Sequence, residues 1–111
     1  MKINFIFGKR RKLQKEKRYK RIQYVSSFSD VPSDPGDVLY IVKGSVAFKW
    51  LVFSCPNSCG RRVEVNLMKK TDPRWDISIK KGKASLFPSV IVNGCGAHFW
   101  IKSNRAIWFE K

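Results

Sequence analysis

The sequence predicts a mainly β fold, built as a small antiparallel sheet or sandwich with a basic N-terminal extension. Segments rich in Val, Ile, Phe, Tyr and Trp recur from residue 37 onward, and several of them alternate apolar with polar residues. No stretch after residue 22 has good helical periodicity. The 111 residues suffice for one domain. We expect residues 1–36 to form the extension and residues 37–111 to form the β domain.

The N-terminal part is expected to contain less regular structure. Residues 1–7 alternate in part, which predicts a short strand. Residues 9–21 are nearly all polar and predict a solvated helix or an extended arm that is mobile when free. Residues 22–28 predict a second strand. Residues 29–37 contain two prolines, a glycine and three aspartates, which predict a loop.

From residue 37 onward, turn-forming residues separate the apolar segments. Gly44 and Ser45 lie between two of them, which predicts a hairpin. Pro88 is expected to break a later strand, and Ser103 with Asn104 is expected to turn the last hairpin. The expected strands span residues 37–44, 45–54, 61–68, 75–80, 83–94, 98–102 and 106–110.

Two short clusters hold all three cysteines and the only histidine of the chain. The motif "CPNSC" places Cys55 and Cys59 around a turn, and "CGAH" places Cys95 three residues before His98. Structural zinc takes four thiolate or imidazole ligands, usually in two such pairs. The spacing therefore predicts one Zn²⁺ per chain, which staples the β domain as in a zinc ribbon. The odd number of cysteines favours a reducing, cytoplasmic location over a disulfide framework.

Alternative interpretations of these four residues stay open. An iron–sulfur cluster could use the same ligands, and cysteine and histidine also occur as ordinary buried or hydrogen-bonded residues. A catalytic zinc is not expected, because it would need an open coordination position. With the only imidazole on the metal, no base remains for Ser89. We therefore expect Ser89 to be a loop or strand-end residue and the protein not to be an enzyme.

The positive charge is concentrated near the N-terminus. The formal net charge is +15, of which residues 1–21 carry +9. Such a segment favours a polyanion, either nucleic acid or an acidic protein surface. Leu13 and Tyr19 would add contact area to the charge. No apolar run approaches about eighteen residues, so no membrane partner is expected. The candidate binding residues are Lys9, Arg10, Arg11, Lys12, Lys15, Lys17, Arg18, Lys20 and Arg21.

Several segments occur in an order that resembles a known family. They are "YIVKG", "FSCPNSCGRRVEVNL", "LFPSV" and "CGAHFWIKSNRAIWFE", within residues 37–110. They resemble a bacterial family of unknown function, made of small zinc-ribbon-like β proteins that are often encoded beside ubiquitin-like conjugation genes. The resemblance implies that Cys55, Cys59, Cys95 and His98 are metal ligands. The chain departs from the family at Asn104, where glycine is common, and in its basic N-terminus. Other recurrent positions match Pro88, Ser89, Phe99 and Trp108.

Together these features predict a non-enzymatic, zinc-binding adaptor or accessory module. The resemblance implies a bacterial ubiquitin-like conjugation or defence system as its setting, with a protein partner and no small-molecule substrate. The alternative is a nucleic-acid-binding zinc module that uses the basic segment. The salt dependence of binding distinguishes these two hypotheses. Phosphate contacts weaken steeply as the salt concentration rises, whereas an interface with an apolar core weakens less.

Overall fold

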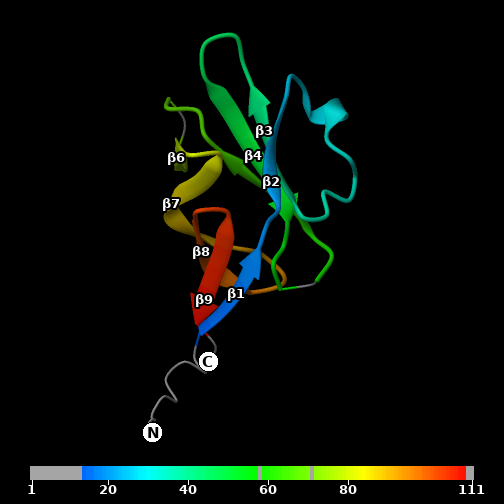
Figure 1. Ribbon diagram of the computed structural model, residues 1–111, viewed down its shortest axis with the longest axis vertical. Helices are drawn as coiled ribbons and strands as arrows, with labels where there is room; N and C mark the ends of the chain where they lie inside the picture. The colour runs from blue at the N-terminus through cyan, green and yellow to red at the C-terminus, as the bar shows by residue number, and fades with distance from the viewer. Residues whose placement is uncertain (1–13, 58, 71, 110–111) are drawn as a thin grey trace, which may run out of the picture.

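The strands form two sheets in the computed structural model, which describes residues 14–57, 59–70 and 72–109 (Figure 1). One sheet has five antiparallel strands in the order β1-β9-β8-β7-β6. The other has four strands in the order β2-β3-β4-β5, with β2 parallel to β3 and the remaining pairs antiparallel. The strands are β1 (Gln14–Arg18), β2 (Arg21–Val25), β3 (Val38–Lys43), β4 (Phe48–Ser54), β5 (Arg62–Asn66), β6 (Asp76–Lys80), β7 (Lys83–Ile91), β8 (His98–Lys102) and β9 (Arg105–Phe109).

The main core lies between the two sheets. Each sheet contributes the apolar half of its alternating residues, and a T-shaped contact between Phe53 and Phe99 joins β4 to β8. A second, smaller core covers the other face of the four-stranded sheet. There the segment between β2 and β3 packs Val31 and Phe28 against Val52 and Trp50. That segment contains one 3-10 helix, Phe28–Asp30.

The outer face of the five-stranded sheet carries the more exposed half of the alternation. On β7, buried Ala84, Leu86 and Val90 alternate with more exposed residues, and on β8 buried Phe99 and Ile101 do the same. The outward residues of these two strands include Ser89 and His98. This face is therefore where the chain can present polar side chains to a partner or substrate.

The mainly β fold is confirmed, and so is each strand expected from residue 37 onward, with shifted ends. Pro88 does not break its strand, because β7 continues through it with a register irregularity between Leu86 and Val90. A proline inside a sheet is accommodated at such bulges, since it has no N–H for the ladder. Within the described ranges, no helix has the length and apolarity needed to cross a membrane.

The basic segment differs from the expected solvated helix or free arm where the structure describes it. Gln14–Arg18 form β1 and pair with β9, and the chain then passes directly into β2 of the other sheet (Figure 1). Tyr19, at this crossing, is 1% exposed and packs against Phe53. Tyr19 is therefore a core residue and not contact area on an arm. The expected strand of residues 1–7 lies outside the described residues.

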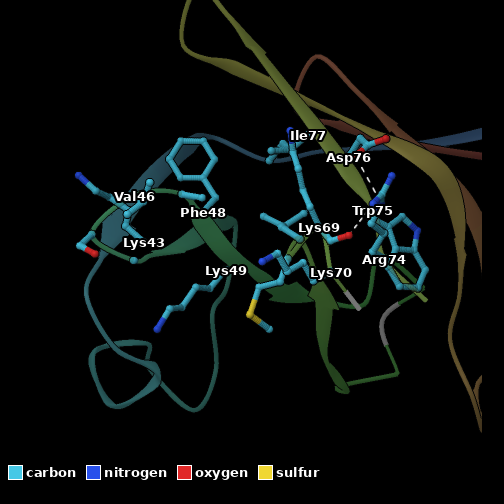
Figure 2. A pocket seen from close by; sticks show the side chains of 15 residues that line it. Lys43, Val46, Phe48, Lys49, Lys69, Lys70, Arg74, Trp75, Asp76 and Ile77 are labelled. Carbon is cyan, nitrogen blue, oxygen red and sulfur yellow. Dashed lines mark hydrogen bonds and ion pairs between the residues drawn. The ribbon is translucent and has the colours of Figure 1, made fainter. Parts of the chain in front are cut away.

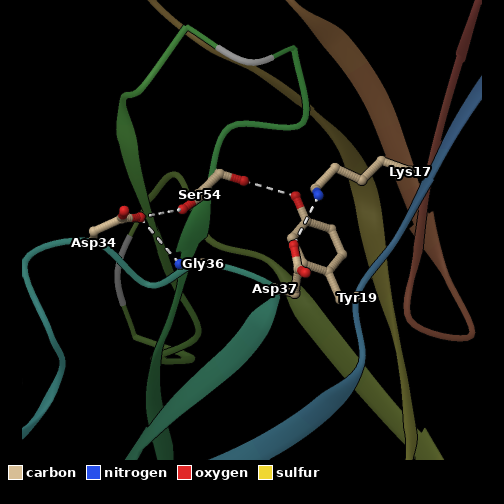
Figure 3. A network of polar contacts seen from close by, with 6 residues as sticks. All are labelled: Lys17, Tyr19, Asp34, Gly36, Asp37 and Ser54. Carbon is tan, nitrogen blue, oxygen red and sulfur yellow. Dashed lines mark hydrogen bonds and ion pairs between the residues drawn. The ribbon is translucent and has the colours of Figure 1, made fainter.

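Hydrogen bonds fix the crossing between the sheets. The Tyr19 hydroxyl donates to the Ser54 carbonyl oxygen at 2.7 Å, and Lys17 Nζ lies 3.0 Å from Asp37 Oδ1 (Figure 3). Burial raises the pKa of Tyr19, so its hydroxyl stays a donor. The bond from Lys17 lowers the pKa of Asp37, which keeps that carboxylate charged. Part of the basic segment thus has a structural role.

Asn104 ties the β8–β9 turn to both β7 and the crossing. Ser103 and Asn104 have positive φ angles of 48° and 64°, as two-residue hairpin turns require. The Ala84 amide donates to Asn104 Oδ1 at 2.7 Å, and the Tyr19 amide donates to the Asn104 carbonyl at 2.8 Å. Asn104 is 4% exposed, and its side chain accepts a hydrogen bond that a glycine could not accept.

We predict that Asn104→Gly destabilises the fold although it keeps the turn geometry. The buried Ala84 amide would lose its partner, which costs about 1–3 kcal/mol of unfolding free energy. Asn104→Ala should cost about 1 kcal/mol more, because alanine also opposes a positive φ. Urea unfolding of the parent protein and both variants measures these differences in unfolding free energy. A glycine variant as stable as the parent protein would show that the Asn104 side-chain bond contributes nothing.

Candidate active site and cysteine cluster

Ser89 lies where the regular pairing of β7 with β8 is interrupted. Leu86 faces Ile101 and Val90 faces Phe99, so three residues of β7 span the space opposite Trp100 alone. Bulges of this kind bend a strand and redirect its side chains, and they are frequent beside active sites. Here the irregularity gives Ser89 a position outside the regular ladder, on the outer face of the sheet.

His98 is the base nearest to this serine. It is the first residue of β8, is exposed, and pairs with Ile91 across the ladder. Its Nε2 atom lies 2.8 Å from Ser89 Oγ. With the ring proton on Nδ1, Nε2 accepts the hydroxyl proton, which is the arrangement of a serine nucleophile and its general base.

Two tryptophans lie beside this pair. Trp75 Nε1 donates a hydrogen bond to the Ser89 carbonyl oxygen at 3.2 Å, and the Trp75 amide donates to Asn66 O at 2.7 Å. The centroids of the His98 and Trp100 rings are 6.1 Å apart, and the two ring planes are inclined by 32°. Among the residues that the structure describes, no carboxylate is hydrogen-bonded to His98, so this part of the site is a Ser–His dyad.

Exposed apolar side chains flank the dyad. Phe87 is 69% exposed and Ile91 is 64% exposed, and they lie two residues before and two residues after Ser89. Most large apolar side chains in the described ranges are at least partly buried, and only Tyr24 and Val46 are comparably exposed. An uncovered apolar surface beside a nucleophile is typical of a place where substrate side chains bind.

The structure brings the three cysteines together. Cys55 follows β4 and is buried, Cys59 is exposed, and Cys95 lies in the loop between β7 and β8. Their Sγ atoms all lie within 4.8 Å of one another, and those of Cys55 and Cys95 are 3.8 Å apart. Two thiolates on a tetrahedral zinc, each about 2.3 Å from it, are about 3.8 Å apart. The cluster therefore fits three of the four ligands of a zinc site.

The electrostatics of the three thiols are uneven. Burial raises the pKa of Cys55 to about 12. The Asn57 amide donates to Cys95 Sγ at 3.4 Å, and this bond is the main reason that the pKa of Cys95 falls to about 7. Of these two thiols, Cys95 therefore loses its proton more readily than Cys55.

His98 does not belong to the group of ligand atoms that the three cysteines form. Two hydrogen bonds shape the intervening loop: Val92 N to Ala97 O at 2.9 Å, and Gly96 N to Val92 O at 2.8 Å. Gly94 and Gly96, with φ angles of 88° and 77°, let the chain turn so that Cys95 faces the cluster while His98 begins β8.

The candidate polyanion-binding residues are spread over several environments. Lys9, Arg10, Arg11 and Lys12 lie outside the described residues. Lys15 and Lys17 are on β1, and Lys17 is engaged by Asp37. Arg18 lies 3.8 Å from Glu16, and Arg21 donates to Gln23 at 3.2 Å. Lys20 is exposed at the crossing. The nucleic-acid role of these residues stays a prediction.

Comparison with known proteins identifies one matching family. The model of a family described as "Bacterial ubiquitination-like system serine protease (BubE)" matches residues 24–109. No curated protein and no solved structure matches the chain. The match confirms the expected association with a bacterial ubiquitin-like system, and it leaves the likeness to a zinc ribbon as a prediction.

The expectation that the protein is not an enzyme is wrong. The family description names a serine protease, which contradicts it. The physical reason lies in His98: the sequence interpretation assigned the only imidazole to the metal and left Ser89 without a base. The structure instead places the imidazole against Ser89 Oγ. The fact that Ser89 and His98 flank a short loop between two adjacent strands was the sequence feature that could have paired them.

Proposed function

Because the chain belongs to the family of bacterial ubiquitination-like system serine proteases (BubE), we propose that it is a hydrolase in which Ser89 is the nucleophile and His98 is the general base. The observation that carries this proposal is the 2.8 Å contact between Ser89 Oγ and His98 Nε2 on an exposed sheet face. The dyad supplies both groups that acyl transfer to serine needs.

The reaction follows from the two side chains. Ser89 Oγ attacks the substrate carbonyl carbon while its proton passes to His98 Nε2. The bond from that carbon to the leaving nitrogen or oxygen then breaks, and the leaving group takes the proton from His98. Water hydrolyses the resulting acyl-serine ester: His98 accepts a proton from the water and returns it to Ser89 Oγ.

The substrate that fits this setting is the C-terminal acyl group of a ubiquitin-like protein, held in a peptide, isopeptide or ester bond. Phe87 and Ile91 would contact apolar side chains of the substrate on either side of the bond that is cleaved. A chain that enters along β7 would pass over both residues and over Ser89. On this route, the exposed apolar side chains, which do not contribute to the core, would serve to bind the substrate.

The test of the proposed role is covalent labelling. A fluorophosphonate probe reacts with serines that an adjacent base activates, and it should modify Ser89. Mass spectrometry of the digested protein would locate the modified residue. Heat-denatured protein is the control, because it keeps the serine but loses the 2.8 Å contact with His98. Labelling at another serine, or none, would contradict the assignment of Ser89.

The cysteine cluster has a separate, structural role in this proposal. Cys55, Cys59 and Cys95 would hold a zinc ion, which ties the end of β4 to the loop before β8. Bound there, the metal supplies folding free energy and takes no part in acyl transfer. Zinc is favoured over harder cations because all three donors are thiols.

We predict that His98→Ala retains about one zinc per chain but loses fluorophosphonate labelling. The three thiols are grouped without His98, whereas the Ser89 hydroxyl is hydrogen-bonded to this ring. Elemental analysis and labelling of the same sample separate the two roles. If the variant keeps labelling and loses its zinc, His98 is a metal ligand as the sequence alone suggests, and the dyad is excluded.

A further inference from the structure

A broad groove lies at the end of the molecule formed by the β3–β4 turn and the β5–β6 connection. Its volume is about 1220 Å³, which is larger than pockets that enclose one small ligand, typically about 300–1,000 Å³. Val46 and Phe48 lie on one side of it, and Arg74 and Trp75 lie on the other (Figure 2). Its size and openness suit a segment of polypeptide.

The floor of the groove is apolar. Phe48, Trp75 and Ile77 line it and are half-buried against the main core. Leu67, also in the lining, is 7% exposed and belongs to that core. Val46, at the tip of the turn, is 95% exposed. An occupant must therefore bring apolar side chains to cover this floor.

The rim of the groove is basic. Its exposed cations are Lys43, Lys49, Lys69, Lys70 and Arg74. The one carboxylate in the lining, Asp76, lies 4.0 Å from Arg74 and offsets only the charge of that arginine. Elsewhere in the described ranges cations such as Lys17 and Arg62 have carboxylate partners. The four lysines of the rim leave an excess of positive charge around an apolar floor.

The groove also connects to the dyad. Trp75 lines the groove, and its Nε1 donates to the Ser89 carbonyl oxygen. Trp75 immediately precedes β6, the strand beside β7. Trp75 thus contacts both the groove and the backbone of Ser89, and a polypeptide held in the groove would pass around the edge strand β6 to reach the Ser89 side chain on the outer face.

We propose that this groove binds an acidic segment of the protein substrate, with apolar side chains set among Asp and Glu residues, and directs it toward Ser89. The link to Ser89 rests on the proposed hydrolase function, whereas the binding itself does not. Nucleic acid is the less favoured occupant, because its phosphates would use the rim and leave the apolar floor uncovered.

The test is binding of a fluorescein-labelled ten-residue peptide of alternating Glu and Leu, measured by anisotropy with the full-length Ser89→Ala protein. Lys69→Glu with Lys70→Glu should weaken binding at least tenfold. Lys80→Glu with Lys83→Glu is the matched control, since it changes the same charge on exposed residues outside the groove lining. That control should change binding less than threefold. Val46→Ser, at an exposed site, should also weaken the peptide complex.

Two further measurements decide the occupant and keep the proposals apart. A labelled DNA duplex that binds more tightly than the peptide, and loses its binding in the Lys69 and Lys70 variant, would overturn the proposal of a peptide occupant. So would peptide binding that this variant leaves unchanged. Fluorophosphonate labelling of Ser89 should be equal with and without the groove substitutions, because the small probe does not need the groove. Absent labelling beside intact peptide binding would reject the hydrolase and retain the groove.

Discussion

Replacing Ser89 with alanine is expected to abolish turnover, lowering kcat/KM by at least about a thousandfold. The substrate for this measurement is the ubiquitin-like protein of the same system with a C-terminal peptide extension. Removal of Oγ eliminates the atom that forms the acyl intermediate, and nothing else in the dyad can replace it. His98→Ala should lower the rate by about 10²- to 10⁴-fold, the usual contribution of general-base catalysis.

Controls for this experiment lie on the same sheet. Ser78 is an exposed serine on β6, so Ser78→Ala changes the same atoms without touching the dyad and should leave kcat/KM unchanged. The main rival nucleophile is Cys95, because the hydrogen bond from Asn57 lowers its pKa and favours the thiolate. Activity that survives in Ser89→Ala would exclude Ser89 as the nucleophile.

The sequence predicts the core of this protein well because its strands are half-buried. Alternation of apolar with polar residues in β5 and β6 follows directly from one buried face, and the structure shows the same pattern. The path of β1 could not be derived in this way, whereas β2 overlaps the strand expected over residues 22–28. The residues of β1 are all polar, and what places them is the buried Tyr19 with its bonds to Ser54 and Asn104.

The candidate site was predictable only in part, for a physical reason. Ligand spacing in the sequence predicts that Cys55, Cys59 and Cys95 lie together, and the structure groups these three cysteines. His98 has suitable spacing for the metal as well and stays a predicted ligand, although the path of the chain places its ring against Ser89 Oγ. That path depends on a bulge at Pro88 and on a glycine-rich loop, neither of which periodicity can resolve.

Removing the metal is expected to unfold the protein or the end of it that carries the cysteines. Structural zinc contributes on the order of 10 kcal/mol in small modules, which is comparable with the whole stability of a typical domain, about 5–15 kcal/mol. Cys55→Ser and Cys95→Ser should therefore lose zinc and lose the cooperative unfolding transition. Elemental analysis and circular dichroism, before and after chelation, measure both effects.

The amide of Asn57 offers a milder variant for the same test. It donates to Cys95 Sγ and favours the thiolate that a metal needs. Asn57→Ala should keep the fold and weaken zinc binding about 10- to 100-fold, as loss of a bond to a ligand does.

Zinc affinity should also fall as the pH is lowered, because protons compete for the thiolates. Since Cys95 anchors the loop before β8, chelation should also change the fluorescence of Trp100 beside His98. Metal-free protein with an unchanged unfolding midpoint, or iron in place of zinc, would contradict a zinc staple at this cluster.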